Sequence, residues 1–183
     1  MPAPGYPHPA IVPPPTAPSG QPLAEFGDRL LARLLDGVIV GVASLVLMVP
    51  LFLWISVAIV DSVESTSPNG LALALNIIGI YLGVLLLSLL MSYIYEVEMV
   101  FRTGQTIGKR VMKLQIVPVG NETMDRGMVA RRWLAAQLGG VLIPGFAWVD
   151  GLWQLWDQPW KQCLHDKFAK TVVVRHDPVK GLA

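Results

Sequence analysis

Three charged side chains stand directly before a long apolar run, at the point where a membrane would begin. Arg29, Arg33 and Asp36 in "RLLARLLDG" are spaced i, i+4 and i+7, so on a helix they form one stripe, with Arg33 and Asp36 within reach of each other. An aspartate inside a bilayer costs about 2.5 to 3.5 kcal/mol, which a nearby guanidinium reduces. Either the arginines anchor the helix at the headgroups with Asp36 as an interfacial partner, or the pair serves a polar pathway or helix contact.

Further reactive side chains lie near the carboxyl end. Cys163, His165 and Asp166 in "QCLHDK" have the residue types of a nucleophile and base, but neighbouring residues in a helix or strand point apart, and no second catalytic motif accompanies them. A metal centre calls for three or four well-placed ligands, which a lone histidine beside an aspartate does not provide. We therefore expect no enzyme activity, cofactor or metal, and retain Asp166 and the intramembrane acid Asp150 as functional polar residues.

A basic turn, "GQTIGKR" (104–110), superficially resembles a phosphate-binding loop. That loop needs four residues between its glycines and a Ser or Thr after the lysine, whereas here there are three residues and Arg110. The stretch is better interpreted as a basic turn leading into a strand. Its Lys109 and Arg110, with Lys113, are predicted to face the cytoplasm or anionic lipid headgroups.

The elements that must position these residues are membrane helices. Only 15% of the 183 residues are charged and 53% are hydrophobic, against roughly 25% charged in a soluble domain. The stretches 37–60 and 70–95 carry no charge, and each exceeds the roughly 20 residues that cross a bilayer. The sequence predicts an all-α polytopic membrane protein with spanning helices over about 28–60 and 70–95.

The distribution of charge predicts the orientation. Seven Lys or Arg residues fall between 96 and 132, whereas the loop 61–70 has acids and no basic residue. The positive-inside rule then places the amino terminus and 96–132 in the cytoplasm, with a bacterial plasma membrane as the expected location. The net charge of +1 does not indicate a nucleic-acid partner.

The third apolar region, 131–156, allows two interpretations. It is long enough for a third span, but this would place the basic carboxyl end outside, against the charge rule. Pro144 and Gly145 at its centre favour a helical hairpin that returns to the same side. The β-branched runs 113–119 and 170–176 predict short cytoplasmic strands, and their pairing requires that both lie on one side.

The ends of the chain have a different composition. Residues 1–22 hold nine prolines and no lysine or arginine, which excludes a cleavable signal peptide. We expect 1–24 to be a disordered cytoplasmic tail, serving as a plain tether or as a docking segment for a protein partner. The membrane domain then covers 25–176, and 177–183 form a short tail.

Three blocks in order, "RLLARLLDG", "GQTIGKRVMKLQIVPV" and "QCLHDKFAKTVVVR", resemble the RDD family of small membrane proteins over about 25–175. The family is named for one arginine and two aspartates. By position, the resemblance assigns Arg33 and Asp36 to the arginine and first aspartate, and Asp166, with Asp150 as the competitor, to the second. The chain departs from the usual pattern at Ile107 and Lys113, where proline and glycine are common. A role in transport, including cation/proton exchange, has been proposed for the family.

Two functions remain open from the sequence. Intramembrane Arg and Asp residues are typical of a polar pathway, and because two spans and a hairpin are too few to enclose one, transport of a small ion or solute requires a homo-oligomer. Alternatively, the chain is an accessory or assembly subunit of a larger membrane complex. GxxxG spacings at Gly37 and Gly41, and at Gly79 and Gly83, allow close contact with another helix.

Overall fold

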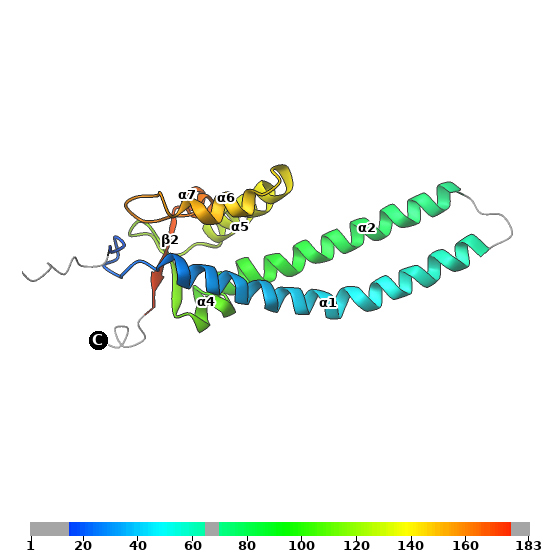
Figure 1. Ribbon diagram of the computed structural model, residues 1–183, viewed down its shortest axis with the longest axis horizontal. Helices are drawn as coiled ribbons and strands as arrows, with labels where there is room; N and C mark the ends of the chain where they lie inside the picture. The colour runs from blue at the N-terminus through cyan, green and yellow to red at the C-terminus, as the bar shows by residue number, and fades with distance from the viewer. Residues whose placement is uncertain (1–14, 65–69, 177–183) are drawn as a thin grey trace, which may run out of the picture.

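The computed structural model describes residues 15–64 and 70–176. Two long helices, α1 (Phe26–Glu64) and α2 (Gly70–Tyr93), run side by side away from an end where the shorter elements gather (Figure 1). Both are long and apolar enough to cross a membrane, over Phe26–Asp61 and Leu73–Thr103. The two predicted long apolar helices are therefore confirmed as helices of spanning length.

The second long helix extends further than the sequence predicts. After Tyr93 it continues as a π-helix, η1 (Ile94–Glu98), and then as α3 (Met99–Thr103), ending at Gly104 in the left-handed conformation. Val97 and Val100 on this extension are buried against the shorter elements that gather at this end of the molecule, which we call the end domain. Tertiary packing thus prolongs the helix past residue 95, the predicted end, into a stretch that carries charges.

A two-stranded antiparallel sheet lies at the end of the molecule where the shorter elements gather. β1 (Leu114–Pro118) pairs with β2 (Thr171–Arg175), with Leu114 opposite Arg175 and Pro118 opposite Thr171. A one-turn helix, α4 (Ile107–Val111), precedes β1, and α7 (Leu164–Ala169) precedes β2. The predicted pairing of these two β-branched runs is confirmed.

The segment before α1 differs from the prediction of a disordered tail up to residue 24. Residues 15–24 pack on the free edge of β2, where Leu23 bridges Val174 and the amide of Ala24 donates to the carbonyl of Val173 at 3.1 Å. Leu23 and Ala24 are buried, so two apolar side chains secure a Pro-rich stretch to the sheet. Residues 1–14 and 177–183, and with them the predicted tail functions, lie outside the described residues.

The third apolar region forms two helices. α5 (Arg126–Leu142) and α6 (Phe146–Trp153) are separated by residues 143–145, with Gly145 at φ +80°. Their shared tip points along the same direction as α1 and α2 (Figure 1). The structure therefore has the predicted hairpin and not a single continuous helix.

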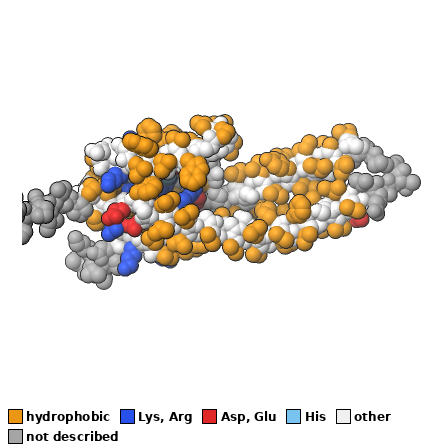
Figure 2. Space-filling model, viewed as in Figure 1, with side chains coloured by type: hydrophobic (Ala, Val, Ile, Leu, Met, Phe, Trp, Pro, Cys, Tyr) orange, Lys and Arg blue, Asp and Glu red, His pale blue; other side chains and the backbone are white. Residues whose placement is uncertain are grey.

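The buried core lies at the sheet end. It joins Ala32 of α1, Val97 of η1, Val129 of α5 and the two strands in one cluster. By contrast, apolar side chains predominate on the visible surface of α1 and α2, while most of the visible charged side chains gather near the sheet (Figure 2). Phe52 and Leu86, for example, are 68% and 65% exposed. Apolar surface on this scale requires a cover that residues 15–64 and 70–176 do not supply.

Candidate functional site

Asp36 of α1 is the centre of a buried polar network. Its carboxylate accepts hydrogen bonds from the Tyr95 hydroxyl at 2.6 Å, the Thr106 hydroxyl at 2.6 Å and the Gly108 amide at 2.7 Å. The ammonium of Lys109 lies 3.9 Å from the same carboxylate. Asp36 is 4% exposed, so these partners replace water around the charge. The carboxylate thereby joins α1 to η1 and α4.

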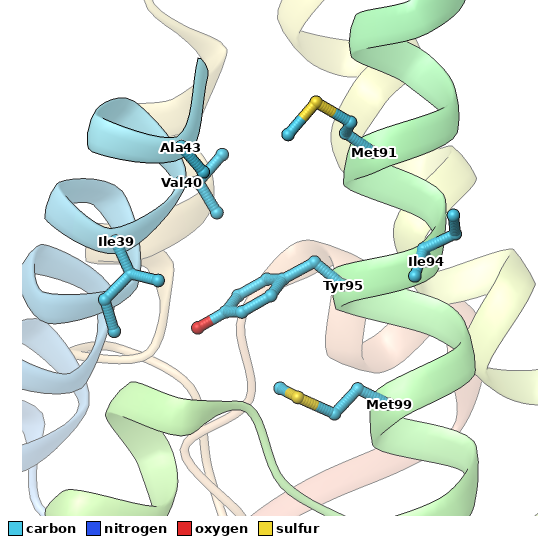
Figure 3. Close-up of a pocket in the computed structure, with 7 residues that line it drawn as sticks. All are labelled: Ile39, Val40, Ala43, Met91, Ile94, Tyr95 and Met99. Atoms are coloured by element: carbon cyan, nitrogen blue, oxygen red, sulfur yellow. The ribbon is translucent and has the colours of Figure 1, made fainter. Parts of the chain in front are cut away.

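The π-helix η1 positions the partners on the second long helix. Tyr95 points from η1 toward α1 (Figure 3), and Glu96 next to it accepts from Arg33 at 3.2 Å. Single π-helical turns inside α-helices are frequent at functional sites. Beside Tyr95 lies an apolar cavity of about 270 Å³ between the helices, lined by Ile39, Val40, Ala43, Met91, Ile94, Tyr95 and Met99 (Figure 3).

The short helix α4 is built to fit against α1. Thr106 is its N-cap, accepting from the Lys109 amide at 3.4 Å while donating to Asp36. Gly108 allows the close approach, because a Cβ there would collide with the carbonyl oxygen of Ala32 and lie 2.7 Å from an Asp36 oxygen. The "GQTIGKR" turn is therefore a docking element for Asp36.

Lys109 provides a pH test of this network. Burial, reinforced by Arg132, lowers its pKa from 10.5 to about 8 despite the attraction of Asp36. The folded state therefore binds fewer protons than the unfolded state between pH 8 and 10.5, and Lys109 makes stability rise with pH in that window. Between pH 8 and 10.5 the unfolding free energy of the wild type should therefore increase by up to about 3 kcal/mol relative to that of the Lys109→Met variant, which lacks this titrating group. Thermal unfolding in detergent across this range measures it, and parallel curves for the two proteins would contradict it.

Asp166 at the start of α7 is the centre of a second network. It is fully buried, and its carboxylate accepts a hydrogen bond from the Arg132 guanidinium, while Arg29 Nη1 lies 3.9 Å away. Burial alone would raise the pKa of Asp166, but Arg132, His165 and Arg29 outweigh it and hold the pKa below its usual value. Asp166 thus remains a charged partner for two guanidinium groups.

Arg29 connects α1 to the sheet end. Its Nη1 donates to the carbonyl of Lys161 at 2.7 Å, and its Nη2 donates to the carbonyl of Val173 at 3.0 Å. The side chain is buried, and within the described part of the chain only its Nε lacks an acceptor among buried side-chain polar atoms. The guanidinium therefore fixes β2 and the loop before α7 against the first turns of α1.

His165 links the hairpin to the second network. Asp150 of α6 accepts from the His165 amide at 2.9 Å, and its other oxygen lies 2.5 Å from Nδ1 of the ring. On the opposite side of the ring, Nε2 lies 3.4 Å from Asp166. Both predicted acids, Asp150 and Asp166, therefore belong to one chain of polar contacts.

Cys163, His165 and Asp166 place ligand atoms within 4.8 Å of one another, as a metal site would. The surrounding charges oppose a cation, because Arg132 and Arg29 already neutralise Asp166. Burial also raises the pKa of the Cys163 thiol to about 12, whereas metal coordination requires the thiolate. The cluster fits an ion-pair network better than a metal centre.

Both networks lie inside one family match. The sequence model of the RDD family matches residues 23–170, which include every charged side chain of the two networks. The chain belongs to the RDD family. No curated protein and no solved structure matches it.

In this RDD protein the predicted pairing of Arg33 with Asp36 does not form. Arg33 is exposed and pairs with Glu96 at 3.2 Å, whereas the buried arginine is Arg29, one helical turn earlier. The spacing on α1 favours a local pair, but the docked backbone of α4 and the Tyr95 hydroxyl take up the Asp36 carboxylate. The two arginines of the stripe therefore lie in different surroundings: Arg29 is buried and Arg33 is exposed.

The remaining site residues of the RDD protein divide in the same way. Arg110 and Lys113 are exposed, as the predicted basic turn requires, while Lys109 joins the Asp36 network. Sequence reasoning missed Tyr95 and Arg132 as partners. Arg132 contributed only to the count of basic residues, and no spacing pattern indicates that Tyr95 meets α1.

Proposed function

We propose that this RDD protein is embedded in a bacterial plasma membrane by α1 and α2, with the sheet and α4 in the cytoplasm. The candidate spans of 36 and 31 residues have exposed apolar surfaces that a bilayer would cover. The seven basic residues between 96 and 132 support the cytoplasmic side for the end domain.

We further propose that the protein is an accessory or assembly subunit of a larger membrane complex. One observation carries this: a groove of about 310 Å³ between α1 and α2, whose α2 wall contains Gly79, Gly83 and Asn76. A Cβ at either glycine would meet nothing within 4 Å, so this chain leaves the space beside them open. Small residues four apart let another helix approach closely, and Asn76 offers it a hydrogen bond.

The surroundings of the two buried acids argue against a polar pathway through them. Every partner of Asp36 and Asp166 described above comes from this chain, and these contacts hold the cytoplasmic elements on α1. The two cavities between α1 and the second long helix are lined mostly by apolar side chains. The buried charges therefore hold the short elements against α1 at the end of the helix pair.

The groove can be tested by filling it. The double variant Gly79→Leu, Gly83→Leu should lose a stoichiometric second polypeptide when the protein is extracted from its host in mild detergent, because the leucines occupy the space of the partner helix. The control is Ala74→Leu, which adds a leucine to the same helix at an exposed position outside the groove. Native mass measurement that finds only copies of this chain in the wild type would contradict the proposal.

Transport by a homo-oligomer is the second candidate. It is favoured by the position of Tyr95, which lines the cavity beside α1 and donates its hydroxyl to Asp36, so that a carboxylate lies next to the space between the helices. Reconstituted vesicles should then show a proton or cation flux that Asp36→Asn abolishes. A strictly monomeric protein without flux would exclude this function.

A further inference from the structure

The hairpin of α5 and α6 presents an apolar surface that the described part of the chain leaves uncovered. Val141, Leu142 and Trp148 are 80%, 72% and 73% exposed, and Trp156 at its end is 72% exposed. Asp150 is the one charged residue between 134 and 156, and it is buried against His165. No exposed charge therefore interrupts this surface.

Two backbone amides at the tip are paired within the protein. The Ile143 amide donates to the Gly139 carbonyl at 2.9 Å, and the Phe146 amide donates to the Ile143 carbonyl at 3.0 Å. Pro144 between them has no amide hydrogen. Lipid offers no hydrogen bonds, so pairing of backbone donors within the protein favours the entry of a turn into it.

Contacts with neighbouring elements fix the direction of the hairpin. Trp133 and Gln137 of α5 both donate to the Ser92 hydroxyl of α2, at 2.9 and 2.8 Å. The Phe146 ring lies so close to Gly139 that a Cβ there would collide with it, so the two arms meet near the tip. As a result, the tip points the same way as the long helices (Figure 1).

We propose that the hairpin tip inserts into the acyl region of the membrane leaflet next to the sheet and does not cross the bilayer. The proposal rests on the membrane embedding of α1 and α2 proposed above. The exposed apolar part of α5, 134–142, and the helix α6 each extend about 12 to 14 Å at 1.5 Å per residue. Half of the hydrocarbon core is about 15 Å, so each arm fits one leaflet. Trp156, at the base of the hairpin, has the amphipathic ring that favours the lipid interface.

Site-directed labelling of the full chain in vesicles tests this insertion. In a Cys163→Ser background, single cysteines at Val141, Leu86, Glu122 and Trp156 carry an environment-sensitive fluorophore. Serine is a good N-cap and therefore keeps the start of α7. Vesicles of phosphatidylcholine and phosphatidylglycerol contain lipids with a nitroxide quencher near the end of the acyl chain. Val141 and Leu86 are strongly exposed, so their replacement disturbs little packing.

We expect the nitroxide to quench the Val141 label within about twofold of the Leu86 label and to leave the Glu122 label unaffected. A water-soluble reductant should reach the Trp156 label from the same side as the Glu122 label. Quenching at Leu86 without quenching at Val141 would mean that a protein surface, such as a second copy, covers the tip, and it would overturn insertion alone. Reaction of Trp156 from the opposite side would show a crossing. Absence of quenching at Leu86 would instead remove the proposed embedding.

Discussion

Replacement of Asp166 by asparagine should lower the unfolding free energy by about 3 to 5 kcal/mol, because it leaves two buried guanidinium groups without their counter-charge. Arg132 donates to this carboxylate, and Arg29 lies 3.9 Å from it. The pKa of Asp166 lies below its ordinary value of 3.8, so wild-type stability falls as the pH drops from about 3.8 toward the lowered pKa, because the unfolded state takes up a proton that the folded state does not bind. The variant should lack this acid-dependent loss. Thermal unfolding in detergent, followed by circular dichroism at neutral and acid pH, measures both effects.

Glu25→Gln is the matched control for this prediction. It removes an equal charge from an exposed pair, Arg175 with Glu25 at 3.3 Å, which contributes no more than about 1 kcal/mol. If Asp166→Asn were as stable as Glu25→Gln, the guanidiniums of Arg29 and Arg132 would have to find water or other acceptors. The second network would then not hold the end domain together.

The parts of the fold that the sequence predicts are those with a local signal. Uncharged runs longer than a bilayer crossing indicate α1 and α2, and the central Pro144 and Gly145 indicate the hairpin. The composition of the two β-branched runs also indicates strands. Their predicted pairing, which requires both runs to lie on the same side of the membrane, agrees with the observed sheet. Each of these inferences uses residues that are neighbours in the chain.

The partners in the two networks could not be predicted for the opposite reason. Tyr95 and Gly108 lie 59 and 72 residues from Asp36, and no local period connects them. Helical spacing instead favours Arg33 as the partner of Asp36, whereas in the folded chain Arg33 forms an ion pair with Glu96. The ordered segment 15–24 was missed because its prolines dominate the composition, whereas two buried side chains, Leu23 and Ala24, decide its position.

The stripe on α1 has a structural role that combines both networks. Arg29 and Asp36 lie two turns apart on one face of the helix, and each reaches a different part of the end domain. Arg29 holds β2 and the loop before α7, while Asp36 holds α4 and η1. One helix that continues toward the apolar end thus positions β2, α4, η1 and the loop before α7.

Replacement of Asp36 by alanine should therefore release α4 from α1. The Thr106 hydroxyl, the Gly108 amide and the Tyr95 hydroxyl lose their acceptor together, and each buried donor left unpaired costs about 1 to 3 kcal/mol. We expect a total loss of about 3 to 5 kcal/mol, and a smaller loss for Asp36→Asn, whose carbonyl oxygen still accepts. Hydrogen exchange measured by mass spectrometry should show faster exchange in the segment 104–112.

Asp61→Asn is the matched control, since it changes an exposed acid on the same helix and should leave exchange at 104–112 unaltered. Unchanged exchange in Asp36→Ala would show that α4 is held by other contacts. The comparison also separates structure from function. If Asp36→Asn abolishes flux or assembly while 104–112 stays protected, the carboxylate acts beyond its own chain. If protection and assembly are lost together, Asp36 acts by holding the sheet end in place.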